Sequence, residues 1–93
     1  MAIIWDPEKR QKLLAERDID IQEIADILLT DDYIDILENP SRPGQQIFVV
    51  HYHKYVHVVP FVIDDNDNII LKTVFPSRKF HQLYGESNEN KTW

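Results

Sequence analysis

The residues best suited to chemistry in this chain are basic side chains and a histidine near its two ends. They fall in two predicted helices, with Lys9, Arg10 and Lys12 in the first and Arg78, Lys79 and His81 in the last. Cutting RNA without a metal needs a base for the 2′-hydroxyl, cations for the charge that develops on the phosphate, and an acid for the leaving oxygen. Histidine titrates near neutrality and can serve as acid or base. The two clusters suit phosphodiester chemistry, although composition alone favours ordinary surface charge.

Three further histidines offer an alternative chemistry. His51 and His53 are two residues apart at the end of a predicted strand, a spacing that predicts a shared sheet face, and His57 follows across a predicted hairpin. Imidazoles suit zinc or copper, but no cysteine and no H-E-x-x-H pattern supports a metal site. Solvated histidines on an exposed face are the simpler interpretation. We expect no bound metal.

Other ligand motifs are weak. Residues 64–68 (DDNDN) resemble the start of a calcium loop but lack its glycine and its distant glutamate, so a hairpin turn is expected. With only Gly44 and Gly85, the chain has no glycine-rich phosphate loop. The sequence therefore predicts no cofactor.

The net charge of −6 is confined to one stretch of the 93 residues. Residues 16–38 hold nine carboxylates against Arg17 alone. This distribution argues against binding nucleic acid through bulk charge, which needs a basic face. A solvated acidic surface, or a contact surface for a basic partner, is expected there.

Length and hydropathy predict a single intracellular domain over residues 1–85 and a polar, frayed tail over residues 86–93. Without a membrane-spanning run or a signal-peptide pattern, a cytoplasmic protein is expected. Apolar periodicity predicts strands at 2–5, 33–38, 46–52, 55–63 and 69–75 and helices at 7–17, 20–30 and 77–84. Asp20 and Glu23 form a predicted capping box, and Pro60 needs a bulge or an edge position without a ladder hydrogen bond. The fold expected is α+β, with two N-terminal helices and a C-terminal helix on one face of a small antiparallel sheet.

Three stretches together resemble the BrnT family of RelE-like ribonuclease toxins from bacterial toxin–antitoxin pairs. Residues 4–9 (IWDPEK) are similar to its W-D-x-x-K start, and residues 17–25 (RDIDIQEIA) to its turn into the second helix. Residues 73–79 (TVFPSRK) resemble its I-I-S-A-R-x-A step from strand to helix. The likeness covers roughly residues 3–84 and implies the RelE-like form of the α+β fold.

The resemblance implies an endoribonuclease that inhibits translation, acting on RNA at the ribosome. It also implies a cognate antitoxin, typically a ribbon-helix-helix protein through which alone the pair contacts operator DNA. Lys9 and Arg78 match basic positions of the family, whereas Arg17 stands where the family has histidine. We therefore expect Lys9, Arg17, Arg78 and His81 to be catalytic, with His51 or His53 as substitutes for His81. The residues expected to contact substrate are Arg10, Lys12, Lys79 and Tyr84. The alternative is a toxin-fold binding module without nuclease activity, acting through a protein partner.

Overall fold

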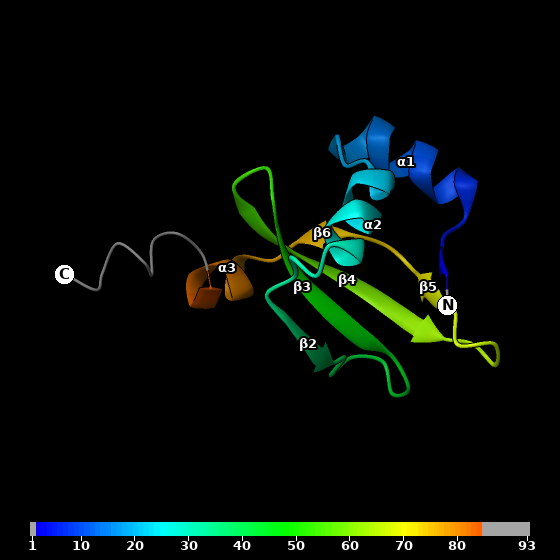
Figure 1. Ribbon diagram of the computed structural model, residues 1–93. Helices are drawn as coiled ribbons and strands as arrows, with labels where there is room; N and C mark the ends of the chain where they lie inside the picture. Colours follow the sequence, from blue (N-terminus) through cyan, green and yellow to red (C-terminus); the bar gives the residue numbers. More distant parts are fainter. Residues whose placement is uncertain (1, 85–93) are drawn as a thin grey trace.

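The computed structural model describes residues 2–84 as three helices and six short strands (Figure 1). The tail predicted for residues 86–93 lies outside the described residues. The elements follow in the order β1 (Ile3–Ile4), α1 (Pro7–Arg17), α2 (Ile21–Leu29), β2 (Asp35–Glu38), β3 (Gln46–Tyr52), β4 (Tyr55–Ile63), β5 (Ile69–Leu71), β6 (Phe75–Pro76) and α3 (Arg78–Tyr84). The α+β class expected from the sequence is confirmed.

The strands form one mixed sheet in the order β1-β5-β4-β3-β2, with β6 also pairing with β4. The pairs β2–β3, β3–β4, β4–β5 and β4–β6 are antiparallel, but β1 lies parallel to β5, with Ile3 opposite Ile69. The expectation of a purely antiparallel sheet is therefore wrong at this edge. The chain leaves β1 through α1 and α2, and such a long excursion allows the N-terminal strand to lie parallel to a later one.

The predicted strand 69–75 is split into β5 and β6 because the chain leaves the sheet between them. The gap coincides with Pro60 of β4, whose carbonyl accepts a hydrogen bond from the Lys72 N–H at 2.8 Å. In a strand the N–H and C=O of one residue point to the same side, so the missing donor of Pro60 also faces this gap. Pro60 therefore lies in an interior strand, at a gap in the ladder between β5 and β6, and not at an edge of the sheet as expected.

One face of the sheet packs under α1 and α2 (Figure 1). Successive strand side chains alternate between faces, so Phe48, Val50 and Tyr52 of β3 all join this core. The remaining buried members are Leu13, Ile19, Ile21, Ile24, Leu28, Val59, Phe61, Leu71 and Val74. The buried positions of α2 are those that the spacing of three and four predicted.

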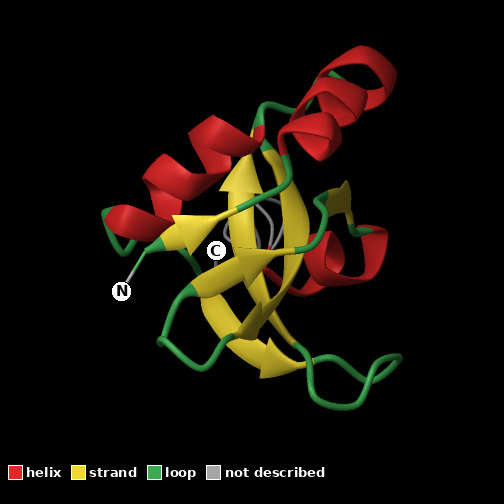
Figure 2. Cartoon of the chain, turned by 90° about the vertical axis from the view of Figure 1, so that its right-hand side faces the viewer, coloured by secondary structure: helices red, strands yellow, loops and turns green. Residues whose placement is uncertain are grey.

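The third helix lies on the opposite face. His51 points away from the α1–α2 core, and its Nε2 lies 3.3 Å from the carbonyl oxygen of Tyr84 in α3. The Tyr84 hydroxyl donates to Asp35 of β2 at 3.4 Å, and Figure 2 shows the strands between α2 and α3. The expectation that all three helices share one face is therefore wrong. The short β6 pairs with the edge of β4 that faces away from β3. Helix α3 follows β6 directly and packs on the face of the sheet opposite to α1 and α2.

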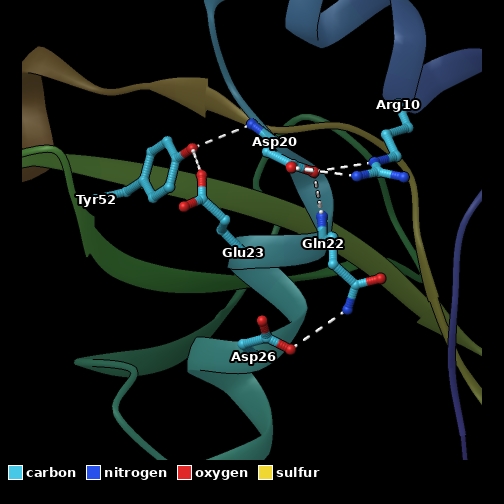
Figure 3. Close-up of polar contacts among 6 residues, drawn as sticks. All are labelled: Arg10, Asp20, Gln22, Glu23, Asp26 and Tyr52. Carbon is cyan, nitrogen blue, oxygen red and sulfur yellow. Dashed lines mark hydrogen bonds and ion pairs between the residues drawn. The ribbon is translucent and has the colours of Figure 1, made fainter.

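A single cluster fixes the start of α2 (Figure 3). Asp20 caps the helix by accepting from the Gln22 N–H at 2.9 Å, and its carboxylate pairs with Arg10 of α1 at 3.0 Å. The Tyr52 hydroxyl accepts from the Asp20 N–H at 3.1 Å and donates to Glu23 at 2.7 Å. The predicted capping box thus closes through a tyrosine hydroxyl on β3, which ties both helices to the sheet.

Among residues 2–84, no helix has the length and apolar character needed to cross a membrane.

Candidate functional site

A cleft of about 510 Å³ gathers cations from three separate parts of the chain. We call it the cationic cleft; its lining residues are Lys9, Asn39, Ser41, Arg42, Gln45, Pro60, Lys72, Thr73 and Phe75. Lys9 comes from α1, Arg42 from the β2–β3 connection, and Lys72 from the gap between β5 and β6. None of these lining residues is a carboxylate, so the cleft is locally positive in a chain of net charge −6.

A second hollow, of about 440 Å³, lies next to the cationic cleft. We call it the histidine pocket; Arg17, Ile19, His57, Phe75 and Pro76 line it. Phe75 borders both spaces, and 37% of its surface is exposed. An exposed aromatic ring between two cation-lined spaces is a surface on which a nucleic-acid base can stack.

Helix α1 positions one cation in each space. Lys9 and Arg17 are eight residues apart, which is about 12 Å along a helix axis. Arg17 donates through Nη1 to the carbonyl of Val74 at 3.1 Å, so the end of α1 is fastened to the segment before β6. Asp18 then ends the helix in the left-handed region (φ 55°), and the chain turns to bury Ile19 beside the pocket.

The β2–β3 connection supplies the third side of the cationic cleft. Gly44 adopts a φ of 85°, a conformation that side chains disfavour, and the turn brings Arg42 and Gln45 to the same space. The Gln45 N–H donates to the carbonyl of Arg42 at 3.1 Å, and the Asn39 N–H donates to the carbonyl of Gln45 at 3.0 Å. The loop is therefore held by its own backbone.

His57 is the buried polar residue of the pocket, with 6% of its surface exposed. Its Nδ1 lies 2.9 Å from the carbonyl of Tyr55, and because a carbonyl only accepts, Nδ1 carries the proton. In the neutral ring Nε2 is then the acceptor. Burial lowers the pKa of His57 below its usual value and outweighs the opposing effect of the Tyr55 carbonyl. His57 is therefore a neutral imidazole of fixed tautomer at pH 7.

His81, the acid/base residue expected from the sequence, lies elsewhere. Its Nδ1 accepts from the backbone N–H of Val56 at 3.2 Å, and its ring stacks on Tyr55 with centroids 4.0 Å apart. The accepting nitrogen is thus engaged by β4, and Nε2 carries the proton in the neutral ring. His81 holds α3 against the sheet and can act as a base only if this bond breaks.

The other two histidines do not complete a metal site. His53 occupies a turn with φ 52°, and its ring stacks on Tyr52 with centroids 3.9 Å apart. His51 faces the other side of the sheet, so the expectation that His51 and His53 share a face is wrong; the positive φ takes His53 out of the strand alternation. No cluster of three or more histidine, cysteine or acidic residues suited to a metal occurs among residues 2–84.

The remaining predicted site residues are dispersed. Arg10 is paired with Asp20, and Lys12 is exposed on α1. Arg78 and Lys79 are exposed at the start of α3, where Arg78 follows Pro76 of the histidine pocket by two residues. The Tyr84 hydroxyl is bonded to Asp35 across the sheet.

Two of the eight predicted residues, Lys9 and Arg17, line the paired spaces. Arg42, Lys72 and Phe75 were not predicted from the sequence as site residues, and His57 was considered only as a metal ligand. Arg42 stands in a proline- and glycine-rich loop and Lys72 in a predicted strand, so neither carried a local signal. His57 had one available signal: it stands in the middle of an apolar strand, directly between Val56 and Val58, and such a position is expected to be buried.

The fold and the paired spaces define a small α+β protein whose mixed sheet separates α1 and α2 from α3. No protein-family model matches the chain, and no curated protein matches it. Its structure is similar to the 1.1 Å crystal structure of the ribonuclease toxin BrnT from Brucella abortus, with a TM-score of 0.63. The likeness covers 83% of this chain and 96% of that chain at 17% sequence identity. The resemblance to BrnT expected from the sequence is confirmed for the fold.

Proposed function

We propose that this chain is the toxin of a toxin–antitoxin pair and that it acts as a ribonuclease. The observation that carries the proposal is the cationic cleft, joined through Phe75 to a pocket that holds Arg17 and His57. The fold similarity to a ribonuclease toxin supports the same class of activity. Cations, a stacking ring and an imidazole are the groups that RNA cleavage by protein side chains requires.

Single-stranded RNA fits this arrangement better than a duplex. Proteins bind single strands by stacking bases on aromatic rings while cations follow the backbone. Phe75 offers the ring, and Lys9, Arg42 and Lys72 offer charges for successive phosphates. Arg17, in the histidine pocket, then holds the phosphate that reacts.

The charge distribution limits how the substrate arrives. The exposed carboxylates of residues 16–38 repel a polyanion over most of its possible approaches. The chain is therefore a poor general RNA binder, and we propose that the ribosome presents the strand to it. On this proposal the chain acts in the cytoplasm, on messages during translation.

The direct test is growth of a bacterial host during induced expression. Wild type should arrest growth, and the triple variant Lys9→Ala, Arg42→Ala, Lys72→Ala should relieve the arrest because it removes the charges of the cationic cleft. Lys54→Gln removes one charge in the β3–β4 turn and serves as the control that should still arrest growth. Arrest by a folded triple variant would show that this cleft is not the site.

We further propose that a cognate antitoxin neutralises the chain and that the pair reaches operator DNA only through that antitoxin. A basic partner matches the exposed acidic residues of α2 and its flanks, among them Glu16, Glu23 and Asp26. A small reading frame beside this gene, encoding a ribbon-helix-helix protein, should restore growth when it is co-expressed. If no adjacent gene restores growth, the proposal that this chain has a cognate antitoxin is wrong.

A second candidate is a toxin-fold binding module without nuclease activity. The specific observation in its favour is that the residues expected to be catalytic are dispersed, with His81 engaged by β4. The two candidates differ in one measurement. Wild-type protein that neither arrests growth nor cleaves message in a purified translation system, but still binds a basic protein partner, would establish the second.

A further inference from the structure

We propose that His57 is the general base of this ribonuclease and that the histidine pocket receives the ribose and reacting phosphate of an RNA strand. The inference rests on the proposed function and adds to it a residue that the sequence motifs did not indicate. It stands on the position of His57 beside Arg17 and Phe75 and on the hydrogen bond that fixes its ring.

The ring of His57 is held in one orientation. The Tyr55 carbonyl takes the Nδ1 proton at 2.9 Å. The Tyr52 ring meets the imidazole edge to face, with centroids 5.4 Å apart and planes at 90°. A base positioned in this way pays little entropy to reach its reactive geometry, because neither the tautomer nor the ring angle must be selected when substrate binds.

The neighbours of His57 suit a nucleotide. Arg17 uses one N–H of Nη1 on the Val74 carbonyl, and its guanidinium has further N–H groups for phosphate oxygens. Phe75 provides the ring for the base, while Ile19 and Pro76 form apolar walls. The adjoining cationic cleft accepts the phosphates that follow.

The reaction that this arrangement serves is transesterification within RNA. Nε2 of His57 takes the proton of the 2′-hydroxyl, and the 2′-oxygen forms a bond to the adjacent phosphorus. The bond from phosphorus to the 5′-oxygen breaks, and that oxygen takes a proton from solvent. The imidazolium then returns its proton to solvent, so the products are a 2′,3′-cyclic phosphate and a 5′-hydroxyl. Arg17 stabilises the charge on the phosphate oxygens during the step.

Protonation states support the assignment. Because burial lowers the pKa of His57, the ring is unprotonated and can accept a proton at neutral pH. His81 is less able to accept a proton from substrate, because its Nδ1 already accepts a hydrogen bond from the Val56 N–H.

The test measures cleavage of a defined message in a purified translation system, with wild type, His57→Gln and the exposed control Lys54→Gln. His57→Gln should cleave about 10²- to 10³-fold more slowly, and the acid limb of the pH–rate profile should disappear. Lys54→Gln should cleave like wild type. Titration with uridine 3′-monophosphate, followed by NMR, should shift the His57 ring nitrogens of the wild type, and the spectrum of His57→Gln should show an intact fold.

The outcomes separate the two proposals. If the wild type cleaves and a folded His57→Gln cleaves equally fast, the role of His57 is overturned while the ribonuclease stands. If the wild type cleaves no message, the ribonuclease is overturned and the general base with it. Cleavage by wild type with loss in His57→Gln, and nucleotide-induced shifts at His57, support both.

Discussion

The Tyr52 hydroxyl joins the end of β3 to the first turn of α2. It accepts from the Asp20 N–H and donates to the Glu23 carboxylate. Burial, opposed by the Asp20 N–H and reinforced by Glu23, raises the pKa of Tyr52 to about 12. A tyrosine on the sheet therefore bridges the Asp20 N–H and the Glu23 carboxylate, which would bond to each other directly in a capping box.

We expect Tyr52→Phe to lower the free energy of unfolding by about 1–2 kcal/mol, because it leaves the Asp20 N–H and the Glu23 carboxylate without this partner. Glu23→Gln, which keeps an acceptor for the hydroxyl, should cost less. Since the pKa of Tyr52 is higher folded than unfolded, its contribution is full below pH 10 and is lost as pH rises toward about 12. Chemical denaturation of each variant measures these differences, and equal stability of Tyr52→Phe and wild type would contradict them.

His57 should give stability a pH dependence on the acid side. Its pKa is lower folded than unfolded, so the unfolded chain binds more protons between the two values. Wild type should therefore lose stability relative to His57→Gln as pH falls below about 6.5 toward the folded pKa. Denaturant midpoints between pH 5 and 8 measure the effect, and parallel curves for the two proteins would show that burial does not control this ring.

At the scale of elements, the β3–β4 hairpin has an unusual turn. His53 and Lys54 both adopt positive φ, at 52° and 63°, as a tight turn between two twisted strands requires. Neither residue favours that region, and the sequence lacks the Asn-Gly pair that signals it. Pairing of Tyr52 with Tyr55, and the stacking of His53 on Tyr52, hold the turn in place.

Lys54→Gly should raise the free energy of unfolding by about 1 kcal/mol, because glycine adopts positive φ without the cost that a side chain carries. In a domain of this size that corresponds to a melting temperature about 4–8 °C higher. Asn66→Gly is the matched control: its φ is not positive, so glycine there should not stabilise. A Lys54→Gly protein that melts below wild type would mean that the lysine side chain itself stabilises the hairpin.

At the scale of the whole molecule, the cationic cleft is lined by no carboxylate although the chain is acidic. The nine carboxylates of residues 16–38 lie between the end of α1 and β2, whereas the cleft is built from α1, the β2–β3 connection and the β5–β6 gap. A net charge of −6 therefore coexists with a local site for phosphates. The affinity for RNA should therefore depend on a few contacts in the site and not on the net charge of the protein.

The dependence of RNA affinity on salt should reflect this small number. Three phosphate contacts in the cleft and one at Arg17 predict that log Kobs falls with log salt concentration with a slope of about −3, since a single strand contributes about 0.7 per contact. Lys9→Ala with Lys72→Ala leaves two contacts and should reduce the slope to about −1.4, whereas Lys54→Gln should leave it unchanged. Fluorescence anisotropy with a single-stranded RNA measures the slopes, and an unchanged slope in the double variant would place the phosphates elsewhere.

Local patterns predicted the elements well because each depends on nearby residues. Asp20 caps α2 as expected, Asp6 caps α1, and the buried positions of α2 follow the helical period. Strand periodicity also located β3 and β4, although Pro60 lies in an interior strand and not at an edge. The division of the predicted strand 69–75 into β5 and β6 was not predicted, because it depends on where this segment leaves its partner β4.

The sequence by itself determined the class of fold, the order of elements, and the separation of acidic from basic segments, because these follow from periodicity, capping and composition. Only the tertiary structure decided which cations meet. Lys9, Arg42 and Lys72 are far apart in the chain, and the path of β4 and the turn at Gly44 bring them to one cleft. The same packing engaged His81 with the backbone of β4 and left His57 buried beside Arg17. Residue types limit the chemistry that a chain can perform. Which of these residues meet in one site depends on long-range packing, which no local sequence pattern encodes.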